Sequence, residues 1–159
     1  MHQFDLKNKT AVITGGAQGF GLDIAKKFLS SGSKVFIWDI DEKELLKATK
    51  EVNNSNLKYN VVDVSNFDQV QKAVNDIILK NKIDILINNA GITGPTAELW
   101  NYDIKDWNSI ININLHGTFY CCKSIVPHMI KNNYGRIVNI ASVAGKDGNA
   151  NASAYSSAK

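Results

Sequence analysis

Five short runs of mostly apolar residues alternate along the chain with longer segments of helical periodicity. The apolar runs are TAVIT (10–14), KVFIWD (34–39), LKYNVVD (57–63), IDILIN (83–88) and GRIVNIAS (135–142). The segments of helical periodicity are residues 20–31, 41–53, 66–81 and 106–131. Strands that are apolar along almost their whole length and are separated by helices are typical of a parallel sheet with both faces covered. The sequence therefore predicts an α/β fold built on a doubly wound parallel sheet.

Residues at the expected helix ends agree with these boundaries. Capping residues, each followed three places later by an acidic residue, are Asp41, Ser65 and Asp103. Gly32 is placed to end the first helix, because glycine accepts the backbone conformation that follows a helix. Two segments without periodicity, 90–102 and 142–153, directly follow strands. We expect both segments at the carboxyl edge of the sheet, where ligands bind in this architecture.

Length and composition indicate one globular domain covering residues 1–159. The chain has 44% apolar and 21% charged residues, which is enough to bury a sizeable core. Its net charge of +3 comes from 18 Lys and Arg against 15 Asp and Glu, scattered and mixed along the sequence. Scattered charge of both signs is typical of a solvated surface, so we expect neither a nucleic-acid partner nor a membrane partner.

The N-terminal residues and the cysteines indicate in which cellular compartment the protein works. The N-terminal sequence MHQFDLKNKTAVITGG has no basic-then-apolar leader, and every apolar run is shorter than the ~18 residues of a membrane span. We therefore expect a cytoplasmic protein. The two cysteines, Cys121 and Cys122, are adjacent in a helical pattern, which suits neither a disulfide framework nor a metal site. We expect them in the core and expect no metal.

A glycine-rich turn joins the first predicted strand to the first predicted helix. In TGGAQGFG, Gly15, Gly19 and Gly21 are spaced T-G-x-x-x-G-x-G and lead into the helix. Such a turn lets the backbone approach a pyrophosphate and directs free helix N–H groups at its charge. The alternative is a tight turn that only tolerates glycine. The position of the turn in the first β-α-β unit favours dinucleotide binding.

The second predicted strand ends in an acidic residue. Asp39 follows Gly21 by eighteen residues, close to the ~20 at which an acid meets the adenosine ribose hydroxyls. A carboxylate there repels a 2′-phosphate, and neither Gln18 nor Trp38 supplies a cation to hold one, so NAD is favoured over NADP. The alternative is that Asp39 only caps the second helix, although Asp41 is the better candidate for that cap.

With these motifs in order, the chain from residue 6 onward resembles the short-chain dehydrogenase/reductase family, whose fold is the Rossmann fold. The resemblance rests on the glycine motif, on Asp63-Val64, on Asn88-Asn89-Ala90-Gly91, on Asn114 in NLHG, and on Ser142, Tyr155 and Lys159. It implies oligomers, as a homodimer or homotetramer formed through the fourth and fifth helices. The cofactor-binding residues that we assign from the motifs and this resemblance are Gly15, Gln18, Gly19, Phe20, Gly21, Asp39, Ile40, Asp63, Val64, Asn89, Ala90, Gly91, Tyr155 and Lys159.

The resemblance also implies a catalytic set of Asn114, Ser142, Tyr155 and Lys159. Tyr155 and Lys159 are four residues apart, so in a helix they share a face, and a nearby ammonium favours the phenolate form of a tyrosine. In the family the tyrosine is the general acid/base, the serine binds the substrate oxygen, the lysine also binds the nicotinamide ribose, and the asparagine continues a proton relay. If the resemblance is set aside, Tyr155 and Lys159 have the spacing of an ordinary pair on the surface of a helix. Asn114 is then a buried polar residue that forms hydrogen bonds with backbone groups. Asn88 and Asn89 could equally tie neighbouring strands together.

Family members continue well beyond the Tyr-x-x-x-Lys helix, with two more strands and a segment that covers the substrate. We therefore expect five strands in the order 3-2-1-4-5, an exposed apolar edge at residues 135–142, and a short, marginal helix at Tyr155. The implied activity is that of an NAD(P)-dependent alcohol dehydrogenase or ketoreductase (EC 1.1.1.-), on a small molecule such as a 3-oxoacyl thioester or a polyol or sugar. The alternative is a non-catalytic nucleotide-binding module, or an inactive fragment of such an enzyme.

Overall fold

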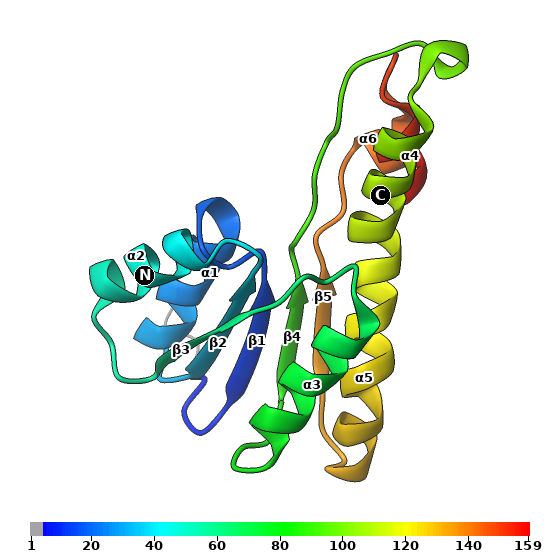
Figure 1. Cartoon of the computed structure of the whole chain (residues 1–159). Coiled ribbons are helices and arrows are strands. Elements are labelled where there is room, and N and C mark those ends of the chain that lie inside the picture. The colour runs from blue at the N-terminus through cyan, green and yellow to red at the C-terminus, as the bar shows by residue number, and fades with distance from the viewer. Residues whose placement is uncertain (1–4) are drawn as a thin grey trace.

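A five-stranded, all-parallel sheet in the order β3-β2-β1-β4-β5 forms the centre of the molecule (Figure 1). The computed structural model describes residues 5–159. The strands are β1 (Thr10–Thr14), β2 (Lys34–Asp39), β3 (Leu57–Val61), β4 (Ile85–Asn88) and β5 (Arg136–Asn139). The predicted fold class and strand order are confirmed, and all five strands lie within the predicted apolar runs.

The helices cover the two faces of the sheet in pairs. They are α1 (Gly19–Ser30), α2 (Glu42–Val52), α3 (Phe67–Ile78), α4 (Ile104–Ile111), α5 (Gly117–Lys131), α6 (Ala144–Asp147) and α7 (Ser153–Ala158), with a 3₁₀ turn η1 (Leu99–Asn101) and a π-helical turn η2 (Asn112–His116). Helices α1 and α2 lie on one face, and α3 and α5 lie on the other (Figure 1). The predicted helix 106–131 is therefore α4, η2 and α5 in succession. The predicted aperiodic segments contain η1 and the short helix α6.

Alternate residues of each central strand point to opposite faces of the sheet, and both faces are covered. In β1, Val12 packs with α3 and α5, whereas Ala11 and Ile13 pack with α1 and α2. All three are fully buried. This two-sided burial explains why the strands are apolar along almost their whole length. Each fully buried Val or Ile side chain contributes about 1.5–3 kcal/mol relative to leaving it exposed.

Helix ends follow the predicted capping residues in two cases of three. Asp41 and Asp103 are the N-caps of α2 and α4. In the first turn of its helix, the Asp41 side chain accepts hydrogen bonds from two backbone N–H groups and the Asp103 side chain accepts one. The predicted cap Ser65 is wrong, because the N-cap of α3 is Asn66. The hydroxyl of Ser65 instead donates to the carboxylate of Asp63 at 2.6 Å. The side chain of Asp63 therefore holds Ser65 in the turn before the helix.

Gly32 lies where the sequence places it, directly after Ser31, the C-cap of α1. Its φ is +90° and its N–H donates to the carbonyl of Leu29 at 3.0 Å. The two cysteines lie in α5, where Cys121 is buried and Cys122 is half-buried. Both thiols are free in the structure.

The segments that follow the strands gather at the carboxyl edge of the sheet. Helices α4, α6 and α7 extend beyond this edge, at the top of Figure 1. Helix α7 is one to two turns long, as expected, and is held because its Ala154 and Ala158 pack against Ile110 of α4. Across residues 5–159, the structure has no helix with the length and apolar character needed to cross a membrane.

Candidate functional site

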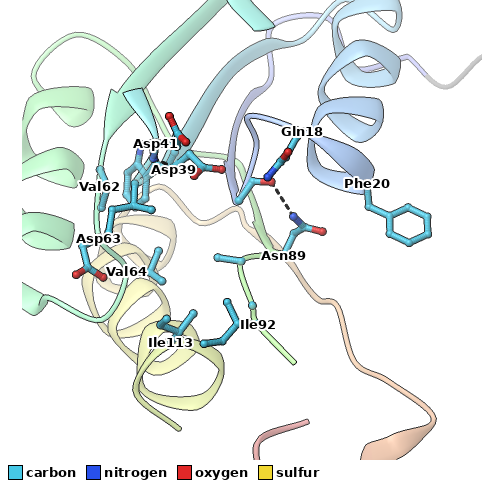
Figure 2. A pocket seen from close by; sticks show the side chains of 15 residues that line it. Gln18, Phe20, Asp39, Asp41, Val62, Asp63, Val64, Asn89, Ile92 and Ile113 are labelled. Atoms are coloured by element: carbon cyan, nitrogen blue, oxygen red, sulfur yellow. Dashed lines mark hydrogen bonds between the residues drawn. The ribbon is translucent and has the colours of Figure 1, made fainter. Parts of the chain in front are cut away.

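A cavity of about 530 Å³ lies at the carboxyl edge of the sheet, between the segments that follow β1, β2, β3 and β4 (Figure 2). Ten of the residues predicted to contact a dinucleotide line it: Gly15, Gln18, Phe20, Asp39, Ile40, Asp63, Val64, Asn89, Ala90 and Gly91. The other predicted site residues do not line it: Gly19, Gly21, Asn114, Ser142, Tyr155 and Lys159. Motifs that are far apart in the sequence therefore meet in one cavity.

Five further residues line the cavity without having been assigned to the site from the sequence. They are Trp38, Asp41, Val62, Ile92 and Ile113. Each of them directly neighbours an assigned residue in the chain, and four follow or end strands, so the ends of the strands were a usable signal. Ile113 comes from η2, and its position follows from tertiary packing rather than from a local pattern.

The glycine loop needs glycine for two separate reasons. Gly15 and Gly19 have φ values of +61° and +53°, in the left-handed region that side chains other than glycine rarely adopt. A Cβ on Gly21 would collide with the carbonyl oxygen of Gly15, so Gly21 allows α1 to start close to the loop. A Cβ on Gly19 would meet no atom within 4 Å, so the space beside Gly19 is open.

The first turn of α1 is free to receive an anion. Its N-cap Gln18 makes no side-chain capping hydrogen bond, and this turn, which the structure describes in full, contains no acidic residue. The first N–H groups of a helix have no partners within the helix and carry the positive end of its dipole. An anion lying over the loop would therefore find unpaired donors and favourable charge.

Asp39 joins the glycine loop to the end of β2. One carboxylate oxygen accepts a hydrogen bond from Ala17 N at 3.3 Å, and the other accepts one from Asp41 N at 3.2 Å. Asp41 caps α2, so the alternative that Asp39 serves only as this cap is wrong. Among the described residues that line the cavity, Asp39, Asp41 and Asp63 are acidic and none is Lys or Arg.

The two asparagines at the end of β4, Asn88 and Asn89, tie this strand to both of its neighbours, which was the structural alternative for them. Asn88 is buried, and its carboxamide donates to Asn139 Oδ1 of β5 at 2.9 Å. The carboxamide of Asn89 donates to the carbonyls of Thr14 and Gly15, both at 3.0 Å. These bonds hold the loops that follow β1 and β4 together and so shape the floor of the cavity.

Gly91 brings two of the predicted catalytic side chains together. A Cβ built on Gly91 would lie 3.0 Å from Asn114 Oδ1 and 3.2 Å from Lys159 Nζ. Lys159 Nζ donates to the carbonyl of Ile140 at 2.8 Å. Burial lowers the pKa of Lys159 from its ordinary value. The Nζ atom of Lys159 therefore lies close to Gly91, at one end of the cavity.

Ser142 and Tyr155 do not line the cavity. Ser142 follows β5, and its hydroxyl accepts a hydrogen bond from Ala144 N at 3.2 Å. Tyr155 is in α7, is half-buried, and packs on the cluster that contains Ile110. Among residues 5–159 no hydrogen bond joins Ser142, Tyr155 and Lys159, and no group of three or more His, Cys, Asp or Glu is placed to hold a metal ion.

A model of the short chain dehydrogenases matches residues 9–159. The 2-dehydro-3-deoxy-L-rhamnonate dehydrogenase (NAD(+)) of Sphingomonas sp. (strain SKA58) is 43% identical over 152 residues, which are 95% of this chain and 60% of that protein. The 3-oxoacyl-[acyl-carrier-protein] reductase of Chlamydia pneumoniae is 39% identical over 157 residues, which are 97% of this chain and 63% of that protein.

A solved structure agrees with these sequence matches. A crystal structure of NAD⁺-bound xylitol dehydrogenase superposes with a TM-score of 0.91 at 33% identity, covering 96% of this chain and 60% of that chain. This chain thus spans about three fifths of the length of the relatives that it matches.

Proposed function

The chain belongs to the short chain dehydrogenase family, and we propose that it acts as an NAD-dependent oxidoreductase on a secondary alcohol or ketone. One observation carries the proposal: a single cavity joins the open glycine loop, the carboxylate of Asp39 and the Gly91 end, where Lys159 lies. A dinucleotide fits this order of groups. Its anionic centre would lie at the glycine loop, its adenosine ribose at Asp39, and its reactive ring at the Gly91 end.

The residues present fit such a dinucleotide. The free N–H groups of α1 and the open space beside Gly19 receive the pyrophosphate. Asp39 accepts hydrogen bonds from the adenosine ribose, and Asp63 and Val64 contact the base. Asp39, Asp41 and Asp63 disfavour a 2′-phosphate, which supports NAD over NADP. The Sphingomonas relative, which is named as an NAD(+) enzyme, supports the same choice.

When bound, the nicotinamide gives or takes the hydride, and the protein must move one proton on or off the alcohol oxygen. Tyr155 exchanges that proton as general acid/base. Lys159 favours the phenolate form of Tyr155 through its charge, and Ser142 donates a hydrogen bond to the substrate oxygen. Asn114 takes part in the relay that carries the proton onward. Burial disfavours the ammonium form of Lys159 and so lowers its pKa. In the same partly dry site, a charge on Lys159 acts more strongly than it would in water.

The proposed substrate is a 3-oxoacyl thioester or a polyol or sugar. A carrier-linked oxoacyl group and a sugar acid are both represented among the relatives named above. Assembly as a homodimer or homotetramer belongs to the same proposal. Exposed apolar side chains on α4, η2 and α5 support it: Ile104, Leu115 and Phe119.

Replacing Tyr155 by Phe tests the proposal against a non-catalytic nucleotide-binding module. NADH affinity is measured by fluorescence titration, and turnover is measured on a panel of polyols, sugar acids and 3-oxoacyl thioesters. We expect the Tyr155→Phe variant to keep its NADH affinity and to lose turnover by at least about 100-fold, the usual size of a general acid/base contribution. The matched control is Tyr134→Phe, at the far end of the sheet, which should keep both.

Three other outcomes would contradict part or all of the proposal. A wild-type chain that binds NADH and turns over none of the panel is a binding module. A chain that does not bind NADH at all contradicts both functions. Turnover that survives Tyr155→Phe excludes the assigned role of Tyr155 while leaving the oxidoreductase function in place.

A further inference from the structure

A second cavity, of about 450 Å³, lies between the C-terminal ends of α3 and α5. These ends are at the amino edge of the sheet, opposite to the edge beyond which α4, α6 and α7 extend (Figure 1). The polar side chains that line it are Lys80, Asn81, Lys82, His128, Lys131 and Asn132. None of its described lining residues is acidic, and none is Phe, Tyr or Trp. We call this cavity the lysine groove.

The three lysines of the groove have no ion-pair partner among residues 5–159. Within this part of the chain their Nζ atoms also make no hydrogen bond. The nearest acidic residues in the sequence are engaged elsewhere: Asp76 of α3 lines a different cavity, and Asp84 pairs with Lys9 at 3.9 Å. Clustered positive charge that the protein does not neutralise attracts anions from solution.

Lysines near helix C-termini often serve the helix itself, by donating to its last carbonyl groups. In this groove two asparagines take that role instead. The carbonyl of Ile77 accepts from the backbone N–H and the carboxamide of Asn81, at 3.0 and 3.2 Å. The carbonyl of His128 accepts from the backbone N–H and the carboxamide of Asn132, at 3.1 and 2.8 Å. The lysine ammonium groups are therefore available to a ligand.

The charge of the groove indicates the charge of its ligand. The C-terminal end of a helix carries about half a negative charge, so the ends of α3 and α5 together supply about one. Lys80, Lys82 and Lys131 supply three positive charges. About two positive charges therefore remain for an anion. Lys34 adds a further charge beside the groove, because its Nζ donates to Asn81 Oδ1 at 2.7 Å.

We propose that the lysine groove binds a small phosphorylated molecule that carries at least two negative charges. Lysine is a common phosphate ligand, because its ammonium is a compact charge with three donors. The volume of the groove is within the range of small-molecule sites. Ile78 is the one apolar residue among those described as lining it, so charge carries the recognition, rather than stacking on a ring or burial of apolar surface.

The inference goes beyond the proposed function and does not depend on it. No described residue of the lysine groove lines the cavity assigned to the dinucleotide, and the two cavities lie at opposite edges of the sheet. A ligand in the groove would contact Lys131 at the end of α5 as well as the lysines that follow α3. It would therefore join two segments that are far apart in the sequence.

NMR titration of the 159-residue chain with inorganic pyrophosphate tests the proposal, because backbone amide shifts report where the anion binds. The ionic strength is held constant with KCl, since salt screens exposed charges. We expect the amide signals of residues 80–82 and 128–132 to shift and to saturate. Signals of residues 15–21 report separately on the glycine loop, which offers a second place for an anion.

Two double variants separate the groove from the total charge. Lys80→Gln with Lys131→Gln removes one exposed ammonium from each side of the groove, and we expect it to weaken this site about tenfold. It should leave the response of residues 15–21 unchanged. The matched control is Lys72→Gln with Lys123→Gln, which removes one exposed lysine each from α3 and α5 outside the groove. The control has the same net charge and should change the affinity little.

Three results would overturn the inference. If pyrophosphate leaves the signals of residues 80–82 and 128–132 unshifted, the groove does not bind phosphates. Equal weakening by the two double variants would mean that the anion responds to total charge and not to the groove. Binding that tightens steadily with the length of a single-stranded DNA oligonucleotide would indicate an extended nucleic-acid surface instead of a small-molecule site.

None of these results bears on the proposed function, because NADH titration and turnover test the other cavity. A chain that binds pyrophosphate in the lysine groove and fails to bind NADH would contradict the proposed function alone. Urea unfolding of both double variants checks that the fold is intact. All four replaced lysines are exposed, so we expect both variants to unfold as the wild type does.

Discussion

The carboxamide of Asn114 is paired with the backbone of Ile92 through two hydrogen bonds. Its Oδ1 accepts from Ile92 N at 2.8 Å and its Nδ2 donates to Ile92 O at 2.9 Å. Asn114 lies in η2 and is only 3% exposed, whereas Ile92 follows the Gly91 turn after β4. The pair holds the segment after β4 against the helical segment α4-η2-α5. This is the structural role that the sequence left open for Asn114, and its role in a proton relay stays a prediction.

We expect Asn114→Ala to lower the free energy of unfolding by about 1–3 kcal/mol, because it leaves a backbone N–H and a carbonyl without partners. Urea denaturation followed by circular dichroism measures this change. Asn112→Ala is the control: Asn112 is in the same π-helical turn, but its carboxamide is exposed and bonds only the ring of His116. Its effect should stay within about 0.5 kcal/mol. Equal effects of the two substitutions would contradict a special role for the Asn114–Ile92 pair.

Thr14, at the end of β1, accepts two hydrogen bonds that position the loop after β4. Its buried hydroxyl oxygen accepts from Asn89 N and Ala90 N, both at 3.0 Å. We expect Thr14→Val, which keeps the shape of the side chain, to cost about 2–4 kcal/mol of unfolding free energy. Thr14→Ser keeps the acceptor and should cost about 1 kcal/mol, the value of one buried methyl group. Nearly equal losses in the two variants would mean that the methyl group, rather than the acceptor, stabilises the loop.

The fold was predictable for two reasons. Both faces of the sheet are covered, so its strands are apolar along almost their whole length, and the spacing of apolar residues differs between strands and helices. The boundary signals failed where two capping residues are adjacent: Ser65 and Asn66 are both suitable, and the side chain of Asp63 decides between them. The π-helical turn η2 was not predictable, because it continues the same helical segment without a break in the apolar pattern. A local sequence pattern indicates the spacing of apolar residues and the capping residues of helices. The choice of Asn66 as the cap and the π-helical turn instead depend on contacts between segments.

The site was predictable to a similar extent. Glycines and acids at the ends of strands carried a local signal, and the cavity contains most of them. The contribution of Ile113 and the pairing of Asn114 with Ile92 depend on how the α4-η2-α5 segment packs against the loop after β4, which no local pattern records. The catalytic roles of Ser142, Tyr155 and Lys159 remain predictions.

Asp39 should control the choice between NAD and NADP. In the proposed function, Asp39→Ala removes a carboxylate that would repel a 2′-phosphate and would accept hydrogen bonds from the ribose. We expect the ratio of NADP affinity to NAD affinity to rise by about tenfold or more, since hydrogen bonds to a charged group contribute about 1.5–3 kcal/mol. Calorimetric titration with both cofactors measures the ratio. Asp76→Ala, on the exposed surface of α3, should leave the ratio unchanged.

The two neighbouring cysteines should differ in reactivity. Burial raises the pKa of the Cys121 thiol to about 12, and the thiolate is the reactive form. At pH 8 a disulfide reagent should therefore modify only the half-buried Cys122 in the native chain and both thiols after unfolding. The Cys122→Ser variant should show no reactive thiol until it unfolds. Rapid modification of two thiols in the native wild type would mean that Cys121 is not shielded.

The same pKa shift predicts how stability depends on pH. An unfolded Cys loses its proton near pH 8.5, whereas folded Cys121 keeps its proton until about pH 12. The folded chain thus binds more protons within this interval, and its free energy of unfolding falls as the pH rises. The contribution is fully present below the ordinary pKa of the thiol. Urea denaturation of the wild type and Cys121→Ala between pH 7 and 10 should show a steeper fall for the wild type, and parallel curves would contradict the prediction.

The two edge strands of the sheet should differ in their tendency to associate. Strand β5 presents Ile137 and Val138, which are 41% and 46% exposed, beside a groove that contains the exposed Ile130. Unpaired backbone groups next to exposed apolar side chains are a template for pairing with another chain. We expect the wild-type chain to aggregate in a concentration-dependent manner on gentle heating. Val138→Lys should slow the growth of turbidity, because a charge on an edge opposes pairing.

Strand β3, at the other edge, provides the matched control. Its Val61 is also 46% exposed, but it is flanked in the strand by the polar Asn60, and Lys58 already places a charge on this edge. Val61→Lys therefore adds the same charge where association is already opposed, and it should change the turbidity little. Dynamic light scattering at several concentrations compares the three proteins. A larger effect of Val61→Lys than of Val138→Lys would mean that β3, rather than β5, is the edge through which chains associate.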